Sequence, residues 1–139
     1  MNIILFDDPQ IRQSLLPLTY TRPVAALRIG ILTIAEKWEK HFNSRLQTQR
    51  ASFLTENYLQ KKFPLNLNDE NILINGAVCP NERLFNKIQN LQHGQSLVKD
   101  KITIAIKFKS KQISDIKSVI RDSKSLSASR LRQAGLPDL

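Results

Sequence analysis

The sequence is poor in the residues that mark several common classes of protein. It has one cysteine, Cys79, so no disulfide can form within the chain, and neither of its two histidines has neighbours at metal-ligand spacing. Four glycines and six prolines exclude collagen-like and low-complexity repeats. No apolar run approaches the length of a membrane span, because Asp7 ends the first run after Phe6. We therefore expect an intracellular, cytoplasmic protein with no export signal and no membrane partner.

Aromatic residues are missing from the most basic part of the chain. The formal net charge is +9, and residues 99–139 contain ten Lys and Arg against four Asp. Such a charge attracts phosphates and other anions. Nucleic-acid binders usually combine basic side chains with exposed aromatics, yet no Trp, Tyr or Phe follows Phe108. We therefore expect no nucleic-acid partner and interpret the basic tail as a solvated surface.

Strand and helix patterns alternate along the first 98 residues. Apolar runs predict strands at 2–6, 51–54 and 71–78, followed by a hairpin of 96–98 and 102–108. Apolar residues three and four positions apart predict helices at 31–42, 55–63, 81–91 and 113–120. This alternation predicts an α/β fold, a mostly parallel sheet with helices on both faces. We place one α/β domain at 1–108 and, at 109–139, a basic helix with a loosely ordered tail from Asp122.

Polar residues follow the first and third predicted strands, whose carboxyl ends lie at the edge where such sheets bind ligands. Asp7 and Asp8 come directly after the first strand and can hold Mg²⁺ through carboxylate oxygens, or they form an acidic turn with Pro9. Asn75 and Gly76 interrupt the third strand, where the backbone either approaches a ligand closely or forms a bulge. We expect the two loops to converge on one site.

The segment from Leu15 to Gly30, LLPLTYTRPVAALRIG, carries the most specific pattern in the chain. It resembles the segment that follows the glycine-rich loop of sugar nucleotidyltransferases, in which Pro-Leu-Thr precedes a further Pro and then a Gly before the first long helix. The matching residues here are Pro17, Leu18, Thr19, Pro23 and Gly30. The resemblance covers roughly residues 1–106. It is to the sugar nucleotidyltransferases related to the N-terminal domain of bacterial N-acetylglucosamine-1-phosphate uridylyltransferase.

The resemblance implies a Rossmann-like three-layer sandwich of the nucleotidyltransferase type. It also implies a reaction in which a nucleoside triphosphate and a sugar 1-phosphate combine, with release of pyrophosphate and with Mg²⁺ as cofactor. Because both substrates are anions, catalysis needs cations that position and neutralise them. We predict Arg22 and Arg28 as the catalytic residues, since a guanidinium fork suits phosphate oxygens. We further predict Mg²⁺ at Asp7 and Asp8, and substrate contacts from Arg12, Thr19, Pro23, Gly30, Asn75 and Gly76.

The chain departs from the family's pattern in three places. Residues 7–14 contain no glycine where the family has its glycine-rich loop, Val24 stands in place of the usual Lys, and Ala77 in place of a metal-binding Asp. Complete domains of this type are longer, so we expect a truncated domain that alone has little activity. The alternative is a non-catalytic module that binds a sugar nucleotide or serves in assembly, and a homo-oligomer is left open.

Overall fold

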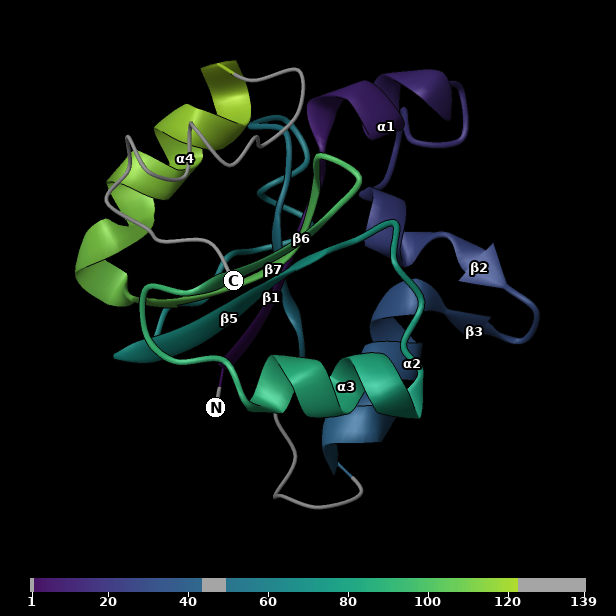
Figure 1. The fold of residues 1–139 in the computed structure, drawn as a ribbon. Coiled ribbons are helices and arrows are strands. Elements are labelled where there is room, and N and C mark those ends of the chain that lie inside the picture. Colours follow the sequence, from purple (N-terminus) through teal and green to yellow (C-terminus); the bar gives the residue numbers. More distant parts are fainter. Residues whose placement is uncertain (1, 44–49, 123–139) are drawn as a thin grey trace.

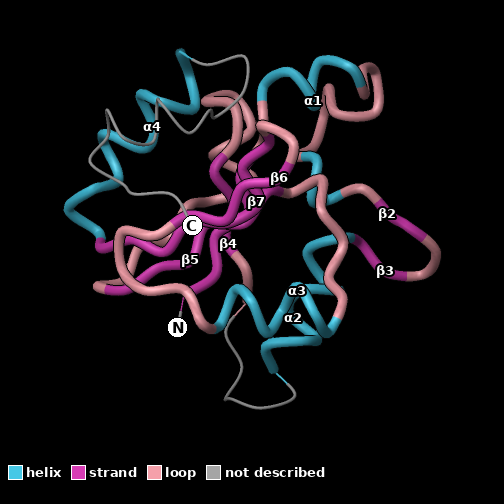
Figure 2. The backbone as a smooth tube through the Cα atoms, viewed as in Figure 1, coloured by secondary structure: helices cyan, strands magenta, loops and turns pink. Residues whose placement is uncertain are grey.

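In the part of the chain that the structure describes, a five-stranded sheet forms the centre of the molecule (Figures 1 and 2). The structure is a computed structural model and describes residues 2–43 and 50–122. The strands, in the order in which they lie side by side, are β4 (Ser52–Leu54), β1 (Asn2–Phe6), β5 (Glu70–Asn75), β7 (Ile102–Lys109) and β6 (Ser96–Lys99). β1 pairs in parallel with β4 and β5, whereas β7 runs antiparallel to β5 and β6. The predicted α/β class with a mostly parallel sheet is confirmed.

Helices cover both faces of this sheet, as predicted. The helices are α1 (Pro9–Ser14), η1 (Val24–Ala26), α2 (Ile34–Asn43), α3 (Glu82–Gln89), η2 (Ser110–Gln112) and α4 (Ile113–Asp122). Successive side chains of a strand point to opposite faces, so Ile3 and Ile4 enter different cores. Ile3 shares a core with Trp38 of α2 and Phe85 of α3, while Ile4 shares the other with Ile116 of α4. The result is a three-layer arrangement with α2 and α3 on one side and α4 on the other (Figure 1).

Trp38 connects α2 to the loop that leaves β5. Its side chain is fully buried, and its indole Nε1 donates a hydrogen bond to the carbonyl oxygen of Val78 at 2.7 Å. Nearby, Phe42 of α2 and Phe85 of α3 meet edge to face, with ring centroids 4.9 Å apart. Buried aromatic pairs of this geometry stabilise a core beyond the area they remove from water. The two helices and the loop after β5 are therefore fixed to one another.

The helix predicted from Ile31 begins three residues later. Ile31 is 86% exposed because a small hairpin, β2 (Arg28–Ile29) and β3 (Leu32–Thr33), precedes the helix. Gly30 forms its turn with a φ of +77°, a conformation that favours glycine. The N–H of Glu36 then bonds Thr33 Oγ1 at 3.1 Å, and the N–H of Thr33 bonds Glu36 Oε1 at 3.3 Å. This reciprocal cap sets the start of α2 after Thr33.

The helix predicted at 55–63 is wrong, because this segment is a series of turns. Gln60 takes over the hydrogen bonds of the local backbone: its Nε2 donates to the carbonyl oxygens of Phe53 and Phe63, and its Oε1 accepts from the N–H of Thr55. Side-chain bonds of this kind compete with helix formation. The segment lies at the carboxyl end of β4, beside β1.

Helix α1 was not predicted, although its signal is present in the sequence. Asp8 caps the helix by accepting hydrogen bonds from the N–H groups of Gln10 and Ile11, and Pro9 occupies the first turn. An acidic cap followed by proline is a typical helix start, which we interpreted as a turn or a metal ligand.

The segment after residue 108 contributes to the core as far as it is described. Ile113 and Ile116 of α4 pack with residues of the sheet. A domain boundary at 108 stays a prediction, and residues 123–139, in which we expected a loose tail, lie outside the described residues. None of the described helices combines the length and apolar character needed to cross a membrane.

Candidate functional site

The loops that leave β1 and β5 meet at the carboxyl edge of the sheet, as expected. The N–H of Gly76 donates to the carbonyl oxygen of Phe6 at 2.9 Å, and the N–H of Val24 donates to Asp7 Oδ1 at 2.9 Å. A Cβ added to Gly76 would lie 3.1 Å from both the Cβ of Ala25 and the carbonyl oxygen of Phe6. The glycine therefore allows the end of β5 to pack against η1, and its contact with a substrate stays a prediction.

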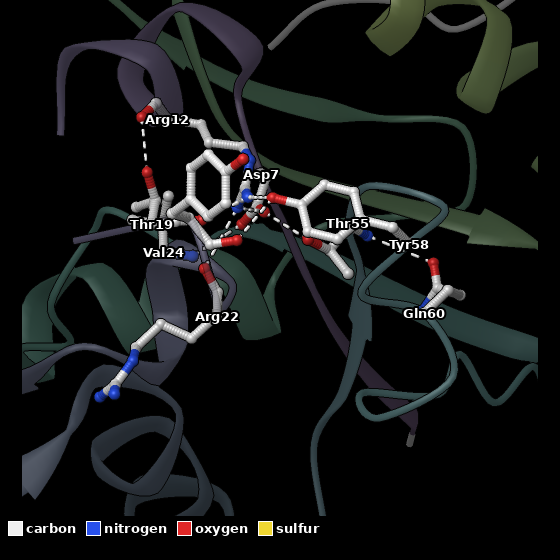
Figure 3. Close-up of polar contacts among 9 residues, drawn as sticks. Asp7, Arg12, Thr19, Arg22, Val24, Thr55, Tyr58 and Gln60 are labelled. Carbon is white, nitrogen blue, oxygen red and sulfur yellow. Dashed lines mark hydrogen bonds and ion pairs between the residues drawn. The ribbon is translucent and has the colours of Figure 1, made fainter. Parts of the chain in front are cut away.

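Asp7 and Arg12 form a buried ion pair at the end of β1 (Figure 3). Arg12 Nη1 lies 3.0 Å from Asp7 Oδ2, and the hydroxyl of Thr55 donates to the same oxygen at 2.6 Å. Burial raises the pKa of the Asp7 carboxyl, against the opposing effects of the Thr55 hydroxyl, the Val24 N–H and Arg12. Both oxygens of this carboxyl are engaged by groups of the protein.

Arg12 also holds the loop that follows α1. Its Nη1 donates to the carbonyl oxygen of Arg22 at 3.2 Å, and its Nη2 donates to the carbonyl oxygen of Thr19 and to the Tyr58 hydroxyl, the latter at 2.8 Å. Thr19 Oγ1 donates back to the carbonyl oxygen of Arg12 at 2.8 Å. Arg12 and Thr19 are 6% and 0% exposed, respectively. The structure thus uses both predicted substrate-binding residues within the protein, and their contact with a substrate stays a prediction.

The two predicted catalytic arginines lie on the surface, outside the cluster formed by Asp7, Arg12, Thr19, Thr55 and Tyr58. The side chain of Arg22 is exposed and points away from Asp7 and Arg12 (Figure 3). Arg28 lies in β2 and donates from Nη1 to the carbonyl oxygen of Ile31 at 2.8 Å, across the hairpin turn. Both cations therefore lie on the segment around η1, which packs at the carboxyl ends of β1 and β5. Their catalytic role stays a prediction.

Three further predicted residues shape the backbone around the site. Pro23 is buried and leads into η1, and Gly30 forms the turn between β2 and β3. Asn75 is fully buried; its Nδ2 donates to the carbonyl oxygen of Thr103 at 3.1 Å, and its Oδ1 accepts from the N–H of Ala77 at 3.0 Å. Asn75 therefore ties the end of β5 to β7 and to its own loop. A contact between these residues and a substrate stays a prediction.

Asp7 and Asp8 do not offer the open set of oxygen ligands that Mg²⁺ requires. Asp8 Oδ1 caps α1, and an ion at Asp7 would have to displace Arg12 and Thr55. Over residues 2–43 and 50–122, no three His, Cys, Asp or Glu side chains gather in a way that could hold a metal ion. Because Mg²⁺ demands near-octahedral oxygen coordination, this donor set does not fit the ion as it stands. Binding of Mg²⁺ stays a prediction.

An open pocket of about 420 Å³ lies at the carboxyl ends of β1 and β4. Its walls come from the end of β4, the residues that follow β1 and β4, the start of α1 and one residue of α4: Asp7, Pro9, Leu54, Thr55, Glu56, Asn57, Gln60 and Lys117. This volume falls in the range of small-molecule sites. The charge of Asp7 is paired with Arg12, so the remaining charged groups of the lining are one carboxylate, Glu56, and one ammonium, Lys117. With its hydroxyl and amide groups, this lining suits a polar ligand of little net charge.

Sequence reasoning missed the contribution of the loop after β4. Thr55 and Tyr58 contact the Asp7–Arg12 pair, and Glu56 and Asn57 line the pocket. The rule that ligands bind beyond the carboxyl ends of parallel strands applies to β4 as well as to β1 and β5. It would have identified this loop had the segment not been interpreted as a helix.

Comparison with known protein families gives one match that covers most of the chain. A family model described as sugar nucleotidyl transferase matches residues 3–133. The matched region includes Asp7, Arg12, Arg22 and Tyr58. A search of curated proteins finds no match. The ion pair, the exposed arginine and the loop after β4 thus all lie within the matched region.

Proposed function

The chain belongs to the sugar nucleotidyl transferase family, and from this membership we propose that it serves the transfer of a nucleoside monophosphate from a nucleoside triphosphate to a sugar 1-phosphate. A phosphate oxygen of the sugar 1-phosphate attacks the α-phosphorus of the triphosphate and forms the new P–O bond. The bond to the bridging oxygen breaks, and pyrophosphate leaves with the electron pair. The family match over residues 3–133 carries this proposal. We also propose that the chain is related to the N-terminal domain of bacterial N-acetylglucosamine-1-phosphate uridylyltransferase.

We assign the phosphates to the surface that carries Arg22 and Arg28. Both residues are exposed, and they lie on the segment that packs over the ends of β1 and β5 through Val24 and Ala25. Guanidinium groups bind phosphate oxygens through paired hydrogen bonds and neutralise the charge that develops during transfer. In the pocket beside β4, Asp7 is paired with Arg12, and Glu56 faces the pocket together with Lys117, so this lining suits the uncharged part of a substrate.

Isothermal titration of the chain with UTP, GTP, CTP and dTTP in the presence of MgCl₂ tests this assignment. At least one nucleotide should give a saturable heat, and Arg22→Ala should weaken that binding about tenfold or more, because a charge-assisted hydrogen bond is lost. Arg50→Ala is the matched control, since Arg50 is also exposed but lies just before β4, at the amino end of that strand. Absence of a saturable heat with all four nucleotides contradicts the proposal.

A non-catalytic role is the second candidate, and the residues around η1 favour it. Val24, which stands where the family usually has a Lys, is 2% exposed and apolar, and Ala77 replaces the expected metal-binding acid. Such a chain would bind a sugar nucleotide or a nucleotide without turning it over. An assay of pyrophosphate release from the bound nucleotide and a panel of sugar 1-phosphates separates the two: release above background supports the transferase, whereas binding without release supports the module.

A further inference from the structure

Hydrogen bonds from Arg12 and Tyr58 join two loops that are far apart in the sequence (Figure 3). The Tyr58 hydroxyl, in the loop after β4, accepts from Arg12 Nη2 at 2.8 Å and donates to the carbonyl oxygen of Tyr20 at 2.6 Å. The same guanidinium reaches the carbonyl oxygens of Thr19 and Arg22. Three carbonyl groups in four residues of the loop 19–22 are therefore held by two side chains.

The loop 19–22 depends on these side chains for its conformation. It has no regular secondary structure, and it lies between the end of α1 and the start of η1. Arg12 is 6% exposed, so its charge is removed from water and compensated by Asp7 and by the carbonyl dipoles. Tyr58, in contrast, is 61% exposed and buries little apolar surface. Its ring lies under the Arg12 guanidinium, with the centroid 5.9 Å from Cζ, and its hydroxyl accepts from that guanidinium and donates to the loop 19–22.

We propose that Arg12 and Tyr58 are positioning residues that fix the loop 19–22 so that the guanidinium of Arg22 faces the phosphates of the nucleotide. The proposal rests on the proposed function. The backbone of Arg22 is held at its carbonyl oxygen, while its side chain stays exposed and points away from the cluster. Fixing the backbone beforehand lowers the entropy lost when the cation is ordered by a ligand. The loop of Tyr58 also lines the pocket through Glu56 and Asn57. The hydrogen bond from Tyr58 to the carbonyl oxygen of Tyr20 therefore also fixes the position of the loop 19–22 relative to the pocket.

Tyr58→Phe removes the hydroxyl alone and is the variant that tests the proposal. Titration uses whichever of UTP, GTP, CTP and dTTP binds the unmodified chain most tightly. We expect the dissociation constant to rise about fivefold to tenfold, the equivalent of one or two hydrogen bonds. Tyr20→Phe is the matched control, because it removes a hydroxyl from an exposed tyrosine of the loop 19–22. Tyr20 contacts Tyr58 through its carbonyl oxygen, which the substitution keeps. Thermal denaturation verifies that both variants fold.

The salt dependence of binding distinguishes positioning of Arg22 from a local effect of Tyr58. A cation that neutralises a phosphate steepens the rise of the dissociation constant with ionic strength. Loss of the Tyr58 hydroxyl should therefore make the plot of log Kd against log NaCl shallower, and Arg22→Ala should do the same. An unchanged affinity, or a weaker affinity with an unchanged slope, overturns the inference while the proposed function stands. Failure of the unmodified chain to bind any of the four nucleotides overturns both.

Discussion

At the scale of single residues, burial of Asp7 determines how one carboxyl responds to pH. Its pKa is raised above the ordinary value of 3.8, with burial as the largest cause. Between that value and the raised one, the folded chain binds more protons at this position than the unfolded chain does. The stability that Asp7 contributes is therefore greatest below this window and falls as the pH rises through it.

Asp7→Asn should reveal this dependence, because asparagine has a similar shape and does not titrate. The free energy of unfolding of both chains is measured by urea denaturation from pH 3.5 upward. In the difference between the two chains, the contributions of the other titrating groups cancel. We expect the advantage of the unmodified chain over Asp7→Asn to shrink as the pH rises. A growing advantage would mean that the ion pair with Arg12 outweighs burial and lowers the pKa.

Gly76 provides a second test at the same scale. Alanine here would place its Cβ 3.1 Å from the Ala25 Cβ and from the Phe6 carbonyl oxygen, and 3.2 Å from the Ala25 nitrogen. Two of these atoms belong to the backbone, so relaxation requires the loops after β1 and β5 to separate. We expect Gly76→Ala to lower the free energy of unfolding by about 1–3 kcal/mol, measured in urea. A loss near zero would show that η1 packs more loosely against the end of β5.

At the scale of elements, α3 depends on a single cap. Asn81 accepts a hydrogen bond from the N–H of Leu84 at 2.8 Å, and the helix then buries Phe85 and Ile88 against the sheet. Asn81→Ala should cost about 1 kcal/mol of stability in a urea titration, because an N–H at the helix start loses its partner. Asn81→Asp, which keeps an acceptor, should remain close to the unmodified chain. Equal stability of all three chains would contradict the role of the cap.

Elements with a clear apolar period were predictable, whereas several boundaries and turns that single side chains determine were not. The strand at 2–6 and the helix capped by Asn81 follow from patterns that burial imposes on several residues at once. The start of α2 depends on the turn at Gly30 and on the cap of Thr33, and the turns after β4 depend on Gln60. Each of these features depends on one or two side chains, and a periodic pattern of apolar residues does not reveal such a dependence.

The candidate site was predictable in its position but not in its contacts. Parallel strands place the residues after β1 and β5 together, so Asp7 and Gly76 were expected at one edge. The sequence could not show that Arg12 is buried while Arg22 is exposed, since both are arginines in polar segments. It also could not show that Tyr58, almost fifty positions later in the sequence, reaches the same guanidinium. Such a contact depends on the parallel pairing of β4 with β1.

At the scale of the whole molecule, α4 decides whether residues after 108 belong to the same cooperative unit. Ile116 is 2% exposed and shares a core with Ile4, Phe6, Leu73 and Phe108. If α4 is an integral layer, Ile116→Ala leaves a cavity and should lower the free energy of unfolding by about 2–5 kcal/mol. Ile31→Ala is the control, because that side chain is 86% exposed. Equal stability of the two variants in urea would show that the helix is an appendage, as a boundary at 108 would imply.

The hydrogen bond between Trp38 and Val78 has a practical consequence. Trp38 is the chain's single tryptophan, and its indole touches the loop that follows β5. Its fluorescence therefore comes from one known place, shielded from water between two helices and the sheet. A shift of its emission toward longer wavelengths would signal that this core has opened, and a change in intensity when nucleotide is added would signal movement of the loop. The molecule thus contains its own optical reporter, and no dye needs to be attached.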